Sequence, residues 1–440
     1  MNKYIPVVFI VLLISSSLVL IDITMKESNH VSEQQENEPP LPETTLSFPE
    51  LHISTSGGVD NDNKETKTPC DILIRDIDKI DNYSGIIKGR GNTSWQDPKK
   101  PYNLILSEKA DLFNMGESKN WCLISNYCDL SLCRNYFAFK IAEMIGCKYT
   151  PDCTFVNLYI DGNYNGLYLL TEKVETGKNR VEIGNTGFLV ELDGYAPSEG
   201  IEDKDWFAID GFNYAVKAGN KDNTGAVSTE LTEGIKNKMN DAWDKLHGGS
   251  WTEVSNTIDV DTFACTFFVN QLFHNEDLNW SSFYFFTEDD GKLSSGPIWD
   301  FDRSASNLLF FYQEENIPAE NHYPIQSFNP NTSWAHLGIW YSLLLQYEEF
   351  RSIISEKVLQ YESSIRTMLT EETKTLLKYK TNFDRNFEKW NIEEIRIYAD
   401  NTIYPTNWYN ELLYVVNWLE TSLQYTVIAY HEGFSGTFYR

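Results

Sequence analysis

DLNWSSFYFFTEDDGKLSSGPIWDFD, residues 277–302, is the most informative stretch of this chain. It combines an aromatic run, an Asp-Gly pair typical of tight turns, and a second run that leads into apolar residues. This order predicts a β-hairpin. If Thr287 faces Lys292 across the turn, the register of all the other pairs follows from that one pair.

The hairpin should gather acidic residues at its open end. Counting outward from the turn places Asp277 opposite Asp302, and it places Asn279 opposite Asp300. Neighbouring carboxylates repel one another unless a cation or a proton neutralises them, and hard oxygen ligands suit Mg²⁺ or Mn²⁺ better than zinc. The large apolar neighbours favour a metal site over the alternative, an acidic hairpin end that is only solvated.

The composition allows a large core and argues against nucleic-acid binding. Of the 440 residues, 41% are hydrophobic and 14% are aromatic, which is ample for one large core or two smaller ones. The chain has 64 acidic and 36 basic residues, a net charge of −28. Because general nucleic-acid binders depend on neutralising phosphates, we expect no nucleic acid among the partners.

The N-terminal segment has the composition of a targeting sequence. Residues 1–25 contain Lys3 and then a nearly uncharged apolar run, which is typical of a signal peptide or an N-terminal membrane anchor. Residues 26–45 are rich in proline and glutamate and predict a disordered tether. We therefore expect an extracytoplasmic protein, secreted or membrane-anchored, whose only membrane contact is this segment.

Hydrophobic patterning predicts an α+β fold for residues 46–430. Short strand patterns dominate residues 46–220, whereas residues 221–430 are mainly helical apart from the hairpin. Asp129 is expected to cap a helix that Gly146 ends. The seven cysteines either pack as apolar thiols or form one or more disulfides, and their spacing does not match a zinc site.

A glycine-rich turn is a candidate phosphate site. Residues 89–94 read GRGNTS and join two expected strands, and Lys100 stands at the start of the second strand. Glycine lets the main chain approach a phosphate closely, while Arg90 and Lys100 would neutralise its charge. The alternative is a tight turn with a solvated basic pair, because the motif is neither a Walker A loop nor a dinucleotide fingerprint.

Two glutamates in apolar strands are candidates for holding a lysine. Glu172 ends the strand YLLTE, and Glu191 lies inside FLVELD. A carboxylate in such a strand either pairs with a cation or points outward to water. Protein kinases place their phosphate-binding lysine with a pair of this kind. No serine, cysteine or zinc catalytic motif competes with this interpretation.

Several longer motifs occur in a fixed order along the chain. They are RGNTSWQDPKKPYNLIL, NWCLISNYCDLSLCRN, FVNLYIDGNYNGLYLLTEKV with NRVEI, GFLVELD, and NEDLNWSSFYFF with GKLSSGPIWDFD. Together they resemble the CotH (spore coat protein H) kinase family, which has an atypical protein-kinase-like fold. The resemblance covers about residues 46–430 and implies two lobes, a β-rich N-lobe (about 46–220) and a helix-rich C-lobe (about 221–430). It also implies ATP-dependent phosphoryl transfer, with Mg²⁺ or Mn²⁺, to Ser or Thr of a surface, coat or secreted protein.

The resemblance also implies roles for individual residues. Asp277 is similar to the catalytic aspartate that orients the acceptor hydroxyl, and Asp300 is similar to the metal-binding aspartate. Lys100 is similar to the lysine that contacts the nucleotide phosphates, with Glu172 as its expected ion-pair partner.

Other residues complete the expected site. Glu191 is a second candidate at the nucleotide, and Arg90 should balance phosphate charge. Asp302, Asn279 and Ser282 are expected on the metal side. Many relatives have a glycine shortly after the last acid, where this chain reads RSASN, and this departure concerns the shape of the loop rather than the acids.

Two other functions fit parts of the sequence. The same fold could serve without catalysis as a surface adhesin or a coat-assembly module, although the intact acids favour an enzyme. A carbohydrate-active domain with paired carboxylates would explain the aromatic content but not the basic turn. For the kinase we expect a Ser-rich, basic protein substrate at the cell surface, in a spore coat or in the mother cell.

Overall fold

The computed structural model describes residues 46–77, 79–197, 205–219, 227–289, 291–305, 307, 338–398 and 407–431. All of them belong to one compact unit, Leu41–Arg440. The expected leader or anchor and the expected tether, residues 1–45, lie outside the described residues. In the part that is described, no helix is both long enough and apolar enough to span a bilayer.

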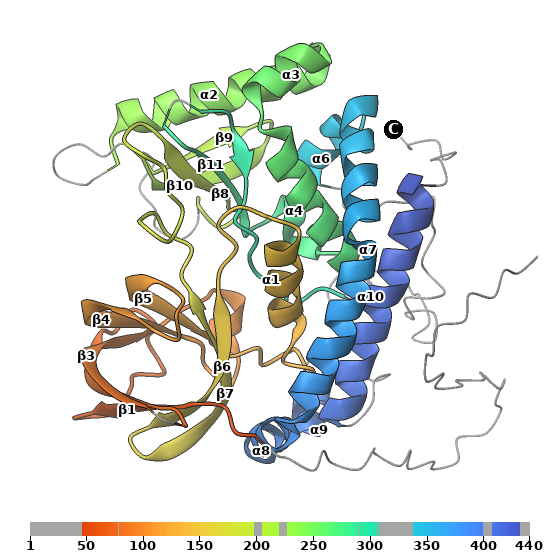
Figure 1. Cartoon of the computed structure of the whole chain (residues 1–440). Coiled ribbons are helices and arrows are strands. Elements are labelled where there is room, and N and C mark those ends of the chain that lie inside the picture. The colour runs from red at the N-terminus through yellow and green to blue at the C-terminus, as the bar shows by residue number, and fades with distance from the viewer. Residues whose placement is uncertain are drawn as a thin grey trace, which may run out of the picture. The chain divides into compact units, whose positions relative to one another are not determined.

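The first part of the chain forms a seven-stranded closed barrel, in the order β1-β2-β3-β4-β5-β7-β6 (Figure 1). Parallel pairing of β1 with β6 closes it, and the other neighbours are antiparallel. Alternate apolar residues such as Leu51, Leu104 and Trp121 fill the interior, as the two-residue strand period requires. The strands are β1 (Glu50–Thr55), β2 (Thr68–Arg75), β3 (Ile80–Gly89), β4 (Tyr102–Asp111), β5 (Glu117–Ile124), β6 (Cys153–Ile160) and β7 (Asn163–Glu172).

A second sheet has five strands in the order β12-β11-β8-β10-β9. Every residue of its central strand is buried, including Glu191. A strand that is covered on both faces reads as a continuous apolar run, which is why FLVEL lacks alternation. The strands are β8 (Phe188–Leu192), β9 (Trp206–Ile209), β10 (Phe212–Ala218), β11 (Phe283–Thr287) and β12 (Ser294–Ser295).

Helices dominate the second half of the chain. Helix α4 is buried from Thr262 to Phe273, and it packs against α1, α7, α10 and β12. The long helices α7 and α10 lie side by side (Figure 1). The helices are α1 (Arg134–Met144), α2 (Thr229–Gly248), α3 (Trp251–Thr257), α4 (Val260–Phe273), α6 (Ile339–Leu344), α7 (Glu348–Leu377), α8 (Lys380–Lys389), α9 (Ile392–Tyr398) and α10 (Trp408–His431), with 3₁₀ turns η1 (Thr93–Gln96) and η3 (Glu276–Asn279). A mixed α+β fold with a β-rich N-terminal region and a helical C-terminal region is confirmed.

The predicted hairpin exists, but its predicted register is wrong. Strand β11 pairs with β12 at Phe286↔Ser294 and Phe285↔Ser295 only, so Thr287 does not face Lys292. Strand β11 instead pairs along its whole length with β8, and residues before Ser282 leave the sheet to form η3. Asp277 and Asp302 therefore do not face each other as paired residues of two neighbouring strands.

The predicted helix start at Asp129 is also wrong. Helix α1 begins at Arg134, and the Asp129 carboxylate accepts hydrogen bonds from the N–H of Ser131 in the preceding loop and from the N–H of Arg134 itself. Gly146 does follow the helix, with a positive φ of 80° that suits glycine after a helix end. All seven cysteines are free thiols, and all but one are buried.

Candidate active site

We call residues 277–302, which carry Asp277, Asp300 and Asp302, the acidic segment. A cavity of about 800 Å³ lies beside it. Its walls come from the glycine-rich turn after β3, from β8 and β10 of the second sheet, and from η3 and the segment after β12. Six of the nine residues singled out in the sequence line this cavity: Arg90, Glu191, Asp277, Ser282, Asp300 and Asp302. The turn and the acids, far apart in sequence, thus face one space.

Asp277, Asp300 and Asp302 are not paired across a β-hairpin, but their charges interact. Burial, followed by the charge of Asp300, raises the pKa of Asp277 to about 7, and Arg303 opposes this rise. The same two causes hold the pKa of Asp302 well above its usual range. Ser282 donates from Oγ to Asp300 Oδ2 at 3.4 Å. The cavity wall therefore concentrates negative charge that a cation would relieve.

Lys217 on β10 is held by two carboxylates. Its Nζ lies 2.7 Å from Glu191 Oε2 and 3.2 Å from Asp193 Oδ2. Burial lowers the pKa of Lys217, but Glu191 and Asp193 outweigh burial, so the pKa is raised and the lysine stays charged. Glu191 also accepts the main-chain N–H of Ser282 at 3.1 Å. One carboxylate thus connects the lysine to the acidic segment.

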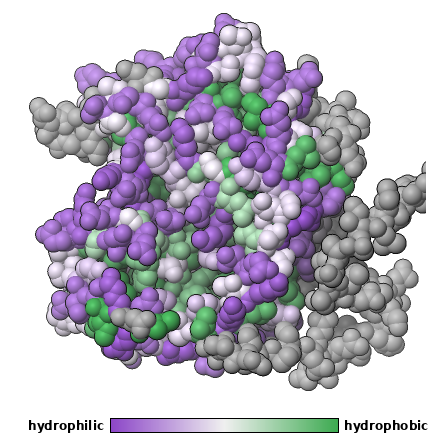
Figure 2. All heavy atoms as spheres, in the orientation of Figure 1, coloured by the Kyte–Doolittle hydropathy of each residue, from purple (hydrophilic) through white to green (hydrophobic). Residues whose placement is uncertain are grey.

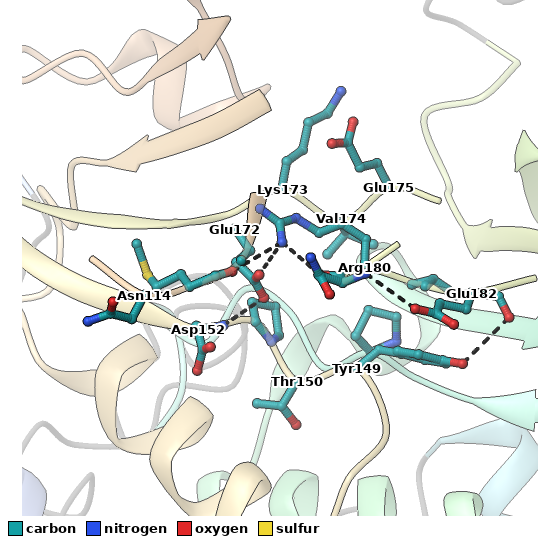
Figure 3. A pocket seen from close by; sticks show the side chains of 16 residues that line it. Asn114, Tyr149, Thr150, Asp152, Glu172, Lys173, Val174, Glu175, Arg180 and Glu182 are labelled. Atoms are coloured by element: carbon teal, nitrogen blue, oxygen red, sulfur yellow. Dashed lines mark hydrogen bonds and ion pairs between the residues drawn. The ribbon is translucent and has the colours of Figure 1, made fainter. Parts of the chain in front are cut away.

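The predicted pair of Lys100 and Glu172 does not form. Lys100 donates from Nζ to the Trp95 carbonyl at 2.7 Å, outside the cavity lining. The strand register places Lys100 near the level of Tyr168, four residues along β7 from Glu172. Glu172 pairs instead with Arg180 (Figure 3).

The Glu172–Arg180 pair belongs to a second pocket, of about 440 Å³. The guanidinium of Arg180 lies 5.0 Å from the centre of the Trp121 ring. Burial raises the pKa of Glu172 to about 7, although the main-chain N–H of Asp152 and the charge of Arg180 oppose the rise. These contacts explain why a carboxylate stands at the end of an apolar strand.

Asn279 is not on the cavity wall. Its Oδ1 accepts the N–H of Ile339 at 2.9 Å, which satisfies a donor at the start of α6. Asn279 thus supports a helix end, whereas Ser282 and Asp302 do face the cavity. Among the described residues, no group of three or more His, Cys, Asp or Glu side chains could hold a metal ion.

The glycine-rich turn has a conformation that its sequence explains. Gly91 has a φ of +80°, and a Cβ there would stand 2.2 Å from Ser94 Oγ, so only glycine fits. Arg90 lies over the Trp299 ring, with its guanidinium carbon 5.4 Å from the ring centre. This contact fixes a cation of the turn against the residue that precedes Asp300.

Several cavity residues escaped the sequence interpretation: Asp193, Trp280, Arg303 and Lys217. Lys217 had a usable signal, because Tyr214-Ala215-Val216 is an apolar run followed by a lysine, like the VAIK sequence of protein kinases. Trp280 is 50% exposed beside the cavity and packs edge-on against Tyr195. No local pattern marks Arg303 or Asp193.

Residues 87–426 match the family model described as CotH kinase protein. No curated protein matches the chain. The match includes the glycine-rich turn, both glutamates, Lys217 and all of the acidic segment, and it confirms the resemblance that the ordered motifs carry. This chain belongs to the CotH kinase family.

Proposed function

We propose that this chain is an ATP-dependent protein kinase that transfers the γ-phosphoryl group to a Ser or Thr hydroxyl of a protein. The observation that carries the proposal is the meeting of Asp277, Asp300 and Asp302 with the Lys217–Glu191 pair around one cavity. Phosphoryl transfer depends on positioning and on charge neutralisation more than on covalent chemistry by the protein. We also propose the two-lobed arrangement of a kinase, with the cavity between a β-rich and a helix-rich lobe.

Asp277 is the proposed residue at the acceptor hydroxyl. A carboxylate that accepts the hydroxyl proton works best when its pKa lies near the working pH, and burial brings that of Asp277 to about 7. Asp277 is fixed by its turn, because its N–H donates to Asn275 Oδ1 at 3.1 Å. Its position in a short turn, rather than in a strand, leaves the carboxylate on the cavity wall.

Lys217 replaces Lys100 as the proposed phosphate lysine. Its two carboxylate partners hold it charged and directed at the cavity, as the lysine–glutamate pair does in protein kinases. Arg90 supplies a second cation at the glycine-rich turn. The two cations line the same cavity as the acids, and they would offset negative charge on the phosphates there.

The residues fit a divalent cation on the acidic side. Asp300 and Asp302 supply hard oxygen donors. Burial, followed by the charge of Asp300, raises the pKa of Asp302, and a cation would offset the second of these causes. When bound, Mg²⁺ or Mn²⁺ would neutralise phosphate oxygens and hold them in place. Two carboxylates leave coordination positions for phosphate oxygens and water, as is usual for Mg²⁺ at a nucleotide.

The proposed acceptor is a Ser-rich, basic protein, and the proposed location is extracytoplasmic. The net charge of −28 would attract a basic substrate and speed its encounter with the enzyme. The apolar segment at residues 1–25 supports export or anchoring.

Radiolabelled ATP, Mg²⁺ or Mn²⁺ and a Ser-rich basic protein test the proposal with the full chain. Asp277→Ala, Asp300→Ala and Lys217→Met should each lower kcat/KM by about 10² to 10³. Lys100→Met is the matched control, because it removes a lysine ammonium outside the cavity, and its activity should stay close to that of the wild type. If the wild type transfers no more label than Asp300→Ala and ATP does not raise Tm, the chain is not a kinase and the adhesin or coat-assembly role takes its place.

A further inference from the structure

The loop after Asp300 is held by side chains from the start of α1, about 170 positions earlier in the chain. Arg134 donates from Nε to the Ser304 carbonyl at 2.9 Å and from Nη2 to the Ala305 carbonyl at 3.3 Å. Asn135 accepts the Phe301 N–H on Oδ1 at 2.8 Å. Three main-chain groups within residues 301–305 are therefore hydrogen-bonded to two neighbouring side chains.

Arg134 is itself fixed by a buried carboxylate. Its guanidinium pairs with Asp129, and the side chains are only 2% and 0% exposed. Asp129 also accepts the N–H groups of Ser131 and Arg134 at 3.0 and 2.9 Å. We call Asn126, Asp129, Arg134 and Asn135 the Arg134 cradle; Asn135 donates to Asn126 Oδ1 at 2.9 Å and completes it.

The segment needs such support because its backbone is unusual. Asp300 has a φ of +64° and Ala305 a φ of +45°, a region that side chains with a Cβ adopt only where the surroundings hold them. The main chain from Asp300 to Ala305 carries both proposed metal ligands, Asp300 and Asp302. A planar guanidinium that bonds two successive carbonyls fixes direction as well as distance, which a lysine ammonium on a flexible stem cannot do.

We infer that Arg134 is a positioning residue, which acts with Asn135 to fix the main chain carrying Asp300 and Asp302 so that their carboxylates bind a divalent cation together. This inference rests on the proposed function for the identity of the cation and its nucleotide. It gives the NWCLISNYCDLSLCRN motif a task, because the cradle residues come from that motif. Arg134 is not among the residues that line the cavity.

Arg134→Lys tests the inference, with Arg180→Lys as the matched control. Both arginines are buried, and both pair with a carboxylate, but Arg180 lies in the second pocket, against Glu172. Three readouts are taken for each full-length protein: Tm, amide hydrogen exchange across residues 300–305, and the affinity for Mn²⁺ with a non-hydrolysable ATP analogue. Asn135→Ala repeats the test through Phe301 in case Arg134→Lys does not fold.

We expect Arg134→Lys to speed exchange in residues 300–305 at least about tenfold and to weaken Mn²⁺ binding at least about fivefold, since a small misplacement of such ligands is costly. Arg180→Lys should lower Tm by a comparable amount without either local effect. The inference is overturned if Arg134→Lys lowers Tm but changes neither the exchange in residues 300–305 nor the Mn²⁺ affinity. It is also overturned if the wild type does not bind Mn²⁺. A wild type that binds Mn²⁺ in an Arg134-dependent way but transfers no phosphate refutes the kinase and leaves the positioning role standing.

Discussion

At the scale of the residue, the ionisation of Asp277 sets a pH requirement. Its pKa of about 7 means that much of the carboxyl group is protonated below pH 7 and cannot accept a hydroxyl proton. We therefore expect kcat/KM to rise with pH, with a midpoint near 7 at low Mg²⁺. Saturating Mg²⁺ should move the midpoint lower, because a cation at Asp300 removes part of the repulsion that raises the pKa.

A pH–rate profile at two Mg²⁺ concentrations measures both effects. Asp277→Asn provides the control, since its residual activity should lose this pH dependence. A wild-type profile that is flat between pH 6 and pH 8 would contradict the assignment of Asp277 as the proton acceptor.

A second residue-scale prediction concerns Glu411 on α10, which is 1% exposed and near Arg134 and Asp129. Burial raises its pKa to about 8, although Arg134 opposes the rise. Between its unfolded pKa near 4.5 and about 8, the folded state holds more protons than the unfolded state, so stability falls as pH rises through that window. Glu411→Gln cannot ionise and should escape this loss.

Urea denaturation at pH 5.5, 7 and 9 checks the prediction. The advantage of Glu411→Gln over the wild type should grow with pH and reach about 1 to 3 kcal/mol at pH 9. Glu371→Gln on the exposed face of α7 should show no such trend. A difference that shrinks with rising pH would mean that Glu411 is ionised at little cost.

At the scale of the element, one buried lysine connects the barrel to α8. Lys99 is 1% exposed, and its Nζ donates to the carbonyls of Ser125 and Leu167 and to Asn386 Oδ1 at 2.8, 2.6 and 3.0 Å. Lys99→Met would leave these buried acceptors without their donor. We expect a loss of about 2 to 4 kcal/mol in the free energy of unfolding.

The comparison with Lys100→Met makes this test specific. Lys100 is the next residue, and its ammonium donates to the Trp95 carbonyl and lies over the Trp95 ring. Its replacement should cost no more than about 1 kcal/mol. Equal losses for the two variants would show that Lys99 does not act as a connection between the elements.

Elements also explain which parts of the site could be predicted. The acids of residues 277–302 and the glycine-rich turn are local motifs, and the sequence identified them directly. The Lys217–Glu191 pair is not local, because it exists only where β10 and β8 run antiparallel, with Ala215 opposite Glu191. The hairpin register failed for the same reason: the partner that shapes β11 is β8, about 90 residues earlier. Lys100 lies close to the turn along the chain, and the family resemblance implied that it contacts the nucleotide phosphates, but the barrel register directs it to the Trp95 carbonyl.

At the scale of the whole molecule, the excess of acidic residues should destabilise the compact state. The net charge is −28, and hydrophilic residues cover most of the face seen in Figure 2. At about 0.1 M ionic strength, salt screens the repulsion between surface charges that are more than about 10 Å apart. Because this repulsion destabilises the compact state, screening it stabilises the folded chain. Raising NaCl from 20 to about 300 mM should therefore increase Tm at pH 8 by several degrees.

Two controls separate general screening from cation binding at the acids of the cavity. Tetramethylammonium chloride at equal ionic strength should give nearly the same increase in Tm, because screening does not depend on a small cation entering the site. The Asp300→Ala variant should respond to NaCl as the wild type does, whereas millimolar Mg²⁺ should raise Tm only in the wild type, by mass action on the folded state. A salt response that disappears in Asp300→Ala would place the destabilising charge in the cavity rather than over the surface of the molecule.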